Sequence, residues 1–599
     1  MGLCESRTAI FRTRKHKLVK KTSSLEQVYG NTQQETTDKL TKSPRSNAAF
    51  NQKLVRDTAA TEEGIKLFDV YSFVNDGNII GEGSNATIRL VMHKVSKRKF
   101  ALKTIESSKI KKEDQAQLWR EVELIRALDH PNIIKIVETF TDDKGDFHLV
   151  LPYCAGGDLF DYLLGGESPR LPEEEVWGFA KNMVGALQYM YKNNVVHRDI
   201  KLENFVFSSK EEGASLVLVD FGFSRTSTAG DVEIQKSIGR GTLYTMAPEL
   251  VDETNENEID GYKADLWAVG VVLYCLLYGS YPYGPGNSTN EKTTSDILTK
   301  NPPFPPSIKV SKRCKSLLVK IFEKDPLKRL TAEQALNDAW LKNPPRKIGR
   351  MDSRSTAGVR EQRRLSHVGK RGVKREKREK TKTVIEQMKL FKTYGVFKKM
   401  ALLAVAQSMD HERISKLTDA FAVFDLNDDG TITWNEFCNI LRQNGFVTGD
   451  QTELELKEIF KYVDQDCTGF IKYTEFIAAC MDNEEYTDET AVQEAFRRLD
   501  IDRKGGITKS NLMDLLKGKL PYGVSDSSVD EAVDRIFAEA DTNNDGVIDV
   551  RELNLVLNND SKKDGWTDDG EGSRASRPSI GSTTSSDSCE PMDVLSSSS

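Results

Sequence analysis

The 599-residue sequence is poor in cysteine: it has eight, scattered along the chain, and no two of them form a C-x-x-C pair. This spacing does not suggest a disulfide framework and is typical of a protein in a reducing compartment. The sequence also lacks a secretory signal pattern. Its longest strongly apolar run, AVGVVLYCLLYG at 268–279, is too short to span a bilayer and predicts a buried core helix.

The net charge of −6 is small for this size, and its distribution is more informative than its sum. Positive charge gathers near the N-terminus and at 360–382, whereas acidic residues cluster in short loops after 424. The composition is ordinary for a soluble chain of several domains, although 22–66 and the Ser-rich tail predict disorder. Five segments are therefore expected: a leader at 1–69, organised regions at 70–341 and 411–557, a junction at 342–410 between them, and a tail at 558–599.

The first residues, MGLCES, match the pattern for N-myristoylation at Gly2, and Cys4 is a candidate for palmitoylation. Basic residues follow at Arg12, Arg14, Lys15, Lys17, Lys20 and Lys21. One myristoyl chain anchors a protein only marginally, and a second acyl chain or a polybasic segment makes the anchoring stable. We therefore expect a cytoplasmic protein held at a membrane; the alternative is an ordinary disordered basic leader.

The region 70–341 contains several ordered motifs that are weak singly. IIGEGSNATIRL places Gly81 and Gly83 in a turn between strand-like stretches, where glycine lets backbone amides approach phosphates. KFALKTI places Lys103 on a predicted strand, and the predicted helix LWREVELIRAL offers Glu121 as an ion-pair partner for it. Further motifs are VVHRDIKLENF at 195–205, LVLVDFGFS at 216–224, APE at 247–249 and ADLWAVG at 264–270. Such an ordered set does not arise by chance.

Together these motifs resemble a eukaryotic protein kinase catalytic domain. The HRDIKLEN loop lacks the tyrosine-kinase pattern, so the resemblance favours a Ser/Thr kinase. It implies that Lys103, fixed by Glu121, holds the α- and β-phosphates of ATP. It also implies that Leu151 is the gatekeeper and that Tyr153 and Cys154 lie along the adenine hinge.

The resemblance implies further roles around the transferred phosphoryl group, whose spread of negative charge calls for cations and positioning. Asp220 and Asn204 would each hold a Mg²⁺ ion. Asp199 would orient the substrate hydroxyl and accept its proton, and Lys201 would steady the γ-phosphate. The structural matches are the Glu249–Arg329 pair and Asp265, which braces the catalytic loop.

Substrate choice is partly readable. Asp158 and Glu203 match positions where similar kinases receive an arginine upstream of the phosphorylated residue. A pair of carboxylates favours a planar guanidinium with bidentate geometry. The expected substrates are therefore proteins with an upstream arginine.

Three features depart from the kinase pattern. Ala86 replaces the third glycine of the phosphate loop, and Leu202 replaces the usual proline of the catalytic loop. The activation segment FSRTSTAGDVEIQKSIGRGTLYTMAPE carries an extra Gly-Arg at 239–240. The residues Asp231, Glu233 and Ser237 remain open alternatives for its activating role.

The second region contains loops with the ligand spacing of calcium-binding EF-hands. In loop 1, DLNDDGTITWNE, the predicted ligands are Asp425, Asn427, Asp429, Thr431 and Glu436. In loop 2, DQDCTGFIKYTE, they are Asp464, Asp466, Thr468, Phe470 and Glu475. In loop 4, DTNNDGVIDVRE, they are Asp541, Asn543, Asp545, Val547 and Glu552, with Asp549 adding a further carboxylate. Four such loops with amphipathic flanking helices predict two paired EF-hand lobes.

Two of the loops depart from the ligand pattern. In loop 2, Lys472 stands where a water usually bridges, and we expect it to weaken the site. In loop 3, DIDRKGGITKSN, Lys504 sits at a ligand position and Asn511 replaces the closing glutamate. Loop 3 is therefore expected to pair with loop 4 without binding calcium well.

The junction contains MKLFKTYGVFKKM at 388–400, a predicted basic amphipathic helix. Its apolar stripe comprises Leu390, Phe391, Tyr394, Phe397 and Met400. A kinase region, such a helix and EF-hand lobes in one chain resemble the calcium-dependent protein kinases of plants and protists. The resemblance implies that the helix couples calcium binding to the kinase. The alternative is a permanent core helix, which its lysines disfavour.

A long basic insert at 345–383 is not part of that family pattern. Its RRLS motif ends at Ser366, which predicts an autophosphorylation or pseudosubstrate site. Anionic lipid is another candidate partner. We expect no nucleic-acid binding, because no aromatic interleaving or recognition fold accompanies the charge.

These features predict a multidomain α+β protein, with a bilobal kinase fold followed by an all-α EF-hand domain of two lobes. The predicted function is a monomeric, membrane-anchored, calcium-activated Ser/Thr kinase that uses ATP, Mg²⁺ and Ca²⁺. One alternative is a calcium-switched scaffold with little catalysis. Another is a constitutive kinase whose EF-hands respond to calcium only structurally.

Overall fold

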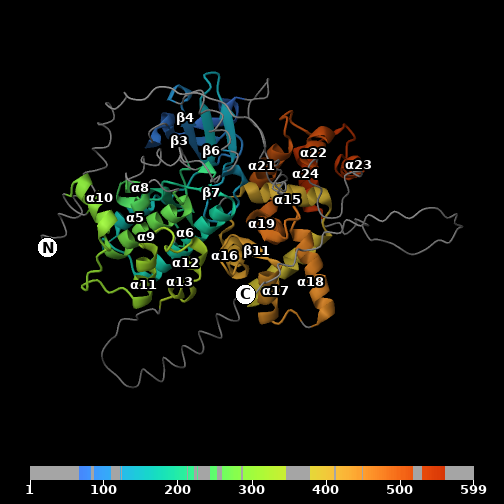
Figure 1. Ribbon diagram of the computed structural model, residues 1–599. Coiled ribbons are helices and arrows are strands. Elements are labelled where there is room, and N and C mark those ends of the chain that lie inside the picture. Colours follow the sequence, from blue (N-terminus) through green and yellow to red (C-terminus); the bar gives the residue numbers. More distant parts are fainter. Residues whose placement is uncertain are drawn as a thin grey trace, which may run out of the picture.

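The structure, a computed structural model, describes residues 66–82, 86–109, 122, 125–166, 168–211, 213–221, 225–226, 243–252, 259–284, 288–345, 378–409, 413–447, 449–516 and 529–559 (Figure 1). A bilobal region over 66–345 lies beside a helical region over 378–559. Some predictions lie outside the described residues: those on Gly2, Cys4, Gly83, Glu121, Asp231, Glu233, Ser237 and Ser366.

The N-lobe is built on an antiparallel sheet in the order β1-β3-β4-β6-β5, with β2 paired to β3. The strands are β1 Tyr71–Phe73, β2 Ile79–Glu82, β3 Ala86–His93, β4 Lys99–Ile105, β5 Glu138–Thr141 and β6 Phe147–Pro152. Before and between them lie α3 Leu67–Val70, η1 Asn75–Gly77 and η2 Ser107–Lys109. Lys103 lies on β4, between Ile88 of β3 and Leu149 of β6, which confirms its predicted strand.

The C-lobe is mainly helical and packs around α9 Gly261–Tyr278. Every residue from 264 to 278 is buried, which confirms the core helix predicted from the apolar run. The other helices are α5 Leu159–Gly165, α6 Glu173–Lys192, α8 Pro248–Val251, α10 Asn290–Thr299, α11 Lys312–Ile321, α12 Ala332–Leu336 and α13 Ala339–Lys342. In the described part of the chain, no helix is long and apolar enough to cross a membrane.

Short hairpins and turns of the C-lobe carry the polar motifs. β7 Val195–Val196 pairs with β10 Arg225–Thr226, and β8 Phe205–Phe207 pairs with β9 Leu216–Leu218. The 3₁₀ turns are η3 Leu202–Asn204 and η5 Leu243–Thr245. The HRDIKLEN loop therefore runs from β7 through η3 to β8, and the DFG aspartate follows β9.

The second region forms the two predicted EF-hand lobes. The first lobe comprises α16 Ser415–Phe424, β11 Thr431–Thr433, α17 Trp434–Gln443, α18 Asp450–Val463, β12 Phe470–Lys472 and α19 Tyr473–Cys480. The second comprises α20 Asn483–Tyr486, α21 Glu489–Leu499, β13 Ile507–Thr508, α22 Lys509–Leu516, α23 Val529–Ala540, β14 Val547–Ile548 and α24 Val550–Asn558. Antiparallel pairing joins β11 to β12 and β13 to β14, so loop 3 pairs with loop 4 as predicted.

The junction differs from the single helix predicted over 388–400. One helix covers 378–393, and α15 Val396–Ser408 begins after a break at Gly395. The backbone of Gly395 is extended, with a ψ of 160°, and this interrupts the helix. Gly395 is the N-cap residue of α15. Leu390 is also exposed, so it does not belong to the buried stripe.

Contrary to the prediction, two of the junction lysines are core residues. Lys398 and Lys399 are buried in α15, which packs between α19, α21 and α24. The Lys398 ammonium lies 4.3 Å from the ring centre of Tyr394, and Lys399 lies 4.7 Å from that of Tyr462. Cation–π contacts and backbone carbonyl acceptors thus replace part of the lost hydration.

Candidate active site and calcium loops

The structure brings together the polar residues predicted around the phosphoryl group. The Lys103 ammonium is 2.5 Å from an Asp220 carboxylate oxygen, which joins the N-lobe sheet to the loop after β9. On the catalytic loop, Lys201 Nζ is 2.5 Å from Asp199 Oδ2, and Asn204 donates to the same oxygen at 3.1 Å. A second bond from Asn204 Nδ2 to the Asp199 carbonyl, 2.6 Å long, fixes the turn between them.

Asp220 is held in an unusual backbone conformation, with a φ of +65°. Left-handed backbone at a non-glycine residue persists only where the surrounding structure holds it in place. Burial favours the protonated carboxyl, but the charge and hydrogen bond of Lys103 outweigh it and lower the pKa of Asp220 to about 2. Asp220 is therefore an anion at any physiological pH.

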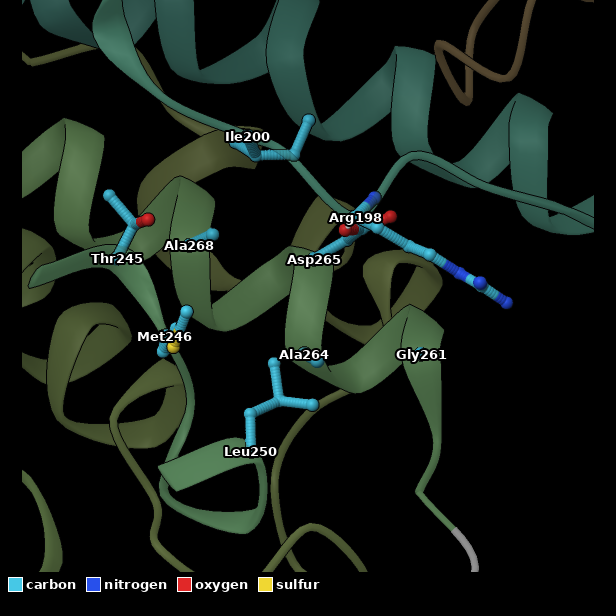
Figure 2. A pocket seen from close by; sticks show the side chains of 9 residues that line it. All are labelled: Arg198, Ile200, Thr245, Met246, Leu250, Gly261, Ala264, Asp265 and Ala268. Atoms are coloured by element: carbon cyan, nitrogen blue, oxygen red, sulfur yellow. Dashed lines mark hydrogen bonds between the residues drawn. The ribbon is translucent and has the colours of Figure 1, made fainter. Parts of the chain in front are cut away.

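Buried groups behind the catalytic loop brace it. Asp265 accepts hydrogen bonds from the backbone N–H groups of His197 and Arg198, at 2.7 and 2.9 Å. The small pocket in Figure 2 lies between Arg198 and the start of α9, where Asp265 points toward the loop. Elsewhere in the C-lobe, Arg329 donates two hydrogen bonds of 2.6 and 2.7 Å to the Glu249 carboxylate. Both pairs match the structural roles expected of them.

The side chains predicted for the adenine pocket follow β6. Leu151 lies on β6 opposite Ala101, and Tyr153 and Cys154 come directly after the strand. Burial raises the pKa of the Cys154 thiol to about 12, so the thiol stays protonated and weakly nucleophilic. Gly81 lies on β2, where an added Cβ would meet Ile88 at 3.3 Å.

The two carboxylates predicted to receive substrate arginine differ in their local roles. Asp158 is the N-cap of α5, and its Oδ1 accepts from the Asp161 N–H at 2.7 Å. Glu203 lies on η3 with its side chain exposed. Although the side chain reaches solvent, partial loss of hydration of the carboxylate raises the pKa of Glu203, and the nearby Asp158 charge raises it further. The sequence did not reveal the capping role of Asp158.

In loops 1 and 4, the first and last predicted carboxylate ligands accept hydrogen bonds from backbone N–H groups of their own loop. In loop 1, the Asp425 carboxylate accepts hydrogen bonds from the N–H groups of Asp429 and Gly430. The Glu436 carboxylate accepts hydrogen bonds from the N–H groups of residues 426 and 427. Loop 4 repeats the arrangement with Asp541 and Glu552. This oxygen set fits a hard divalent cation.

Loop 2 gathers three buried carboxylates, Asp464, Asp466 and Glu475, whose ligand oxygens lie within 4.8 Å of one another. Among the described residues, no donor reaches the buried Asp466 Oδ1, which therefore suits a metal ion. The other oxygen of Asp466 contacts the Lys472 ammonium. Loop 2 thus has the oxygens for calcium together with a lysine that competes for one of them.

The EF-hand lobes contact the kinase-like lobes through the calcium loops, and no sequence pattern predicted these contacts. Asp129 accepts from the Thr474 N–H at 2.9 Å and from its hydroxyl at 2.6 Å, at the end of loop 2. On α6, Lys181 lies 2.7 Å from Asp428, and Lys192 contacts Asp429. The interface therefore involves one predicted calcium ligand directly.

Comparison with known proteins assigns both regions. The family described as "Protein kinase domain" matches residues 74–341, and the "EF-hand domain pair" matches 414–481 and 489–554. Calcium-dependent protein kinase 21 of Arabidopsis thaliana is 31% identical over 524 residues, 86% of this chain and 88% of that protein. The chain belongs to the calcium-dependent protein kinases. Calcium-dependent protein kinase 5 of Plasmodium falciparum is 30% identical, over 82% of this chain and 78% of its own length.

As a calcium-dependent protein kinase, the chain is a calcium-activated enzyme that transfers phosphate from ATP to serine or threonine of proteins. It uses ATP and Mg²⁺, and its EF-hands bind Ca²⁺. The predicted family, fold class, activity and cofactors are thereby confirmed. The roles of individual site residues stay predictions.

Proposed function

We propose that Asp199 accepts the proton of the substrate hydroxyl while Lys103 and Lys201 hold the phosphates. The observation that carries this proposal is the proximity of two groups, Lys103 with Asp220 and Asp199 with Lys201 and Asn204, which are joined by the backbone hydrogen bond from the Val219 N–H to the Asn204 carbonyl. The oxygens of Asp220 and Asn204 fit Mg²⁺, which prefers such ligands and neutralises phosphate charge when bound. Lys103 would exchange part of its contact with Asp220 for the nucleotide.

The test is phosphate transfer to an RRLS-type peptide at varied free calcium. Asp199→Asn keeps the shape of the side chain but removes the base, so the expected fall in kcat is about 10²- to 10⁴-fold. Asp143→Asn, at an 87% exposed side chain on the loop before β6, is the matched control and should leave kcat unchanged. Equal activity of wild type and Asp199→Asn would refute the assigned role, and no activity in the wild type would favour a scaffold.

We further propose that Glu203, assisted by Asp158, receives an arginine upstream of the phosphorylated residue. Glu203 is exposed, whereas one oxygen of Asp158 is already occupied by the Asp161 N–H. Glu203→Gln should therefore raise KM for an arginine peptide about tenfold, as expected for loss of a charged hydrogen bond. It should leave KM unchanged for a peptide lacking that arginine. An equal effect on both peptides would contradict the assignment.

We infer that the junction transmits the calcium signal. The EF-hand helices enclose α15, and the α15 carbonyl of Ser408 accepts from Arg98 of the N-lobe at 2.5 Å. The preceding helix is held through Lys389 to Glu455 at 3.0 Å and Lys392 to Glu458 at 2.6 Å. Hydrogen exchange over 384–408 should change on calcium addition. Identical exchange with and without calcium would leave the junction a permanent core element.

We also propose that acylation at Gly2 and Cys4 holds the kinase at a membrane. The support is the sequence pattern, because these residues lie outside the described part of the chain. In a cell extract that acylates proteins, Gly2→Ala should abolish sedimentation with anionic vesicles, and Cys4→Ser should weaken it. Unchanged sedimentation of Gly2→Ala would refute the anchor.

We propose in addition that the chain is a monomer. Light scattering of the purified chain tests this proposal.

Ser366 is proposed as an autophosphorylation or pseudosubstrate site. Its support is the RRLS motif, which carries the upstream arginine expected of substrates. Mass spectrometry after incubation with ATP should find phosphate at Ser366. If Ser366→Ala changes neither total autophosphorylation nor basal activity, the proposal fails.

A further inference from the structure

Loop 3 does not fit calcium, and its residues have other partners. The Lys504 ammonium at ligand position five lies 3.1 Å from Asp502, at ligand position three. Asn511, which stands in place of the closing glutamate, uses its side-chain oxygen to accept from the Thr508 N–H at 2.9 Å. Calcium loops normally supply several carboxylates and a bidentate glutamate. The question is therefore what the loop does in place of binding calcium.

The fourth residue of loop 3, Arg503, reaches the kinase N-lobe. Its guanidinium is 3.3 Å from Glu138 at the start of β5 and lies 5.5 Å from the ring centre of Phe140. Glu138 also accepts from Arg497 of α21 at 2.8 Å and from the Tyr71 hydroxyl at 2.8 Å. Glu138 is only 9% exposed, so this is a buried anion with a full set of donors.

The fourth residue of loop 1 makes the corresponding contact with the C-lobe. Asp428 lies 2.7 Å from Lys181 of α6. Both fourth residues have left-handed backbone, with φ of +54° for Asp428 and +53° for Arg503. Position four is not one of the calcium-ligand positions. The EF-hand turn therefore presents this residue outward, whatever the loop does with calcium.

The two contacts have opposite polarity. An acid of the first EF-hand lobe meets a base of the C-lobe, and a base of the second EF-hand lobe meets an acid of the N-lobe. A module turned end for end would place Asp428 against Glu138 and Arg503 against Lys181. Like charges brought together at an interface oppose the wrong arrangement. A second N-lobe pair, Arg98 with Glu494 of α21 at 2.5 Å, has the reverse polarity, so the discrimination rests on the position-four residues and not on the net charge of the N-lobe.

We propose that position four of loops 1 and 3 forms a charge code that fixes which EF-hand lobe docks on which kinase lobe, and that loop 3 serves this docking in place of calcium binding. Loop 3 then contributes to activation only by contact. Docking is separate from the catalytic roles of Asp199 and Lys201, because the contact can be measured without phosphate transfer.

The N-lobe contact is tested by charge reversal at position four. Arg503→Glu should speed hydrogen exchange of β5 about tenfold at saturating calcium, because it places a second anion beside Glu138. Asn544→Glu is the matched control, because it places an anion at position four of loop 4. Among the described residues, Asn544 makes no hydrogen bond or ion pair with either kinase lobe. Arg503→Lys keeps the charge, so its β5 exchange rate should stay near that of the wild type. This variant keeps the test interpretable if Arg503→Glu does not fold.

The C-lobe contact allows a rescue experiment. Lys181→Glu and Asp428→Lys should each raise the radius of gyration in calcium, and the double variant, which restores the pair in reverse, should return it to the wild-type value. Calcium counting by titration calorimetry completes the test. Asp500→Asn in loop 3 should leave the number of bound ions unchanged, whereas Asp541→Asn in loop 4 should lower it by one.

The result expected is rescue by the double variant, an effect of Arg503→Glu that Asn544→Glu lacks, and no calcium lost with Asp500→Asn. Loss of an ion in Asp500→Asn would overturn the assignment of loop 3. Equal exchange in Arg503→Glu and Asn544→Glu would overturn its docking role. A double variant no better than either single variant would overturn the charge code.

Discussion

Two glycines on helix α6 allow the docked position of the EF-hand module to be tested with a single methyl group. Gly178 and Gly185 are both interior to the helix, seven residues apart. A Cβ added at Gly178 would meet no atom within 4 Å, whereas one at Gly185 would lie 2.5 Å from the backbone carbonyl oxygen of Asp428. Figure 1 shows α6 beside α16 and β11 of the first EF-hand lobe.

Only one of the two substitutions is expected to affect docking. Either Gly→Ala change favours the helix itself by about 1 kcal/mol. At Gly185 the new methyl overlaps a backbone oxygen that cannot rotate away, and overpacking of this kind costs about 1–3 kcal/mol. Because the overlap exists only in the docked arrangement, G185A should weaken docking by about 5- to 150-fold. G178A should stabilise the kinase lobe and leave docking unchanged.

Small-angle scattering at saturating calcium measures docking through the radius of gyration, and thermal unfolding measures the helix effect. G185A should increase the radius of gyration and lower calcium-stimulated activity, whereas G178A should match wild type in both and unfold at a slightly higher temperature. If the two variants have the same radius of gyration and activity in calcium, the Gly185–Asp428 contact does not form and α6 does not dock against loop 1.

Three further results are expected. Lys472→Thr removes the ammonium beside Asp466, so calcium titration should show loop 2 binding about tenfold more tightly; an unchanged affinity would mean that Lys472 does not compete. Glu249→Gln leaves the buried Arg329 without its anion and should lower the free energy of unfolding by about 3–5 kcal/mol, and a loss below about 1 kcal/mol in denaturant titration would argue against that pair. Burial and the Arg497 charge lower the pKa of His93 from 6.5 to about 4. Between these pH values the unfolded chain binds a proton that the folded chain excludes. The free energy of unfolding should therefore fall by up to about 3 kcal/mol as pH drops from 6.5 to 4. His93→Asn should flatten that slope, and an equally steep decline in this variant would assign the acid sensitivity to other groups.

The predicted residues of the catalytic loop could be recognised in the sequence because they belong to one short motif. Asp199, Lys201 and Asn204 lie within six residues of one loop, and their mutual hydrogen bonds follow from that spacing. The calcium loops are equally local, since Asp425 and Glu436 close one turn of the chain. Local spacing also predicted that loop 3 binds calcium poorly.

The junction was predicted less well, for a physical reason. Periodicity indicated a helix at 388–400 but did not show that Gly395 ends one helix and begins another. The lysines were judged by their charge, yet Lys398 and Lys399 are buried because Tyr394, Tyr462 and Tyr486 supply aromatic faces from distant parts of the sequence. A side chain's environment is set by the elements packed around it.

The sequence by itself predicted the chemistry, namely which oxygens meet a cation and which residues surround the phosphoryl group, because most of these residues lie in short motifs whose geometry is local; the pairing of Lys103 with Asp220, 117 positions apart, is the exception. Only the tertiary structure decided how the two regions meet. The contacts of Glu138 with Arg503 and of Lys181 with Asp428 join residues separated by hundreds of positions. Such contacts depend on the relative placement of whole lobes, which no single stretch of sequence encodes.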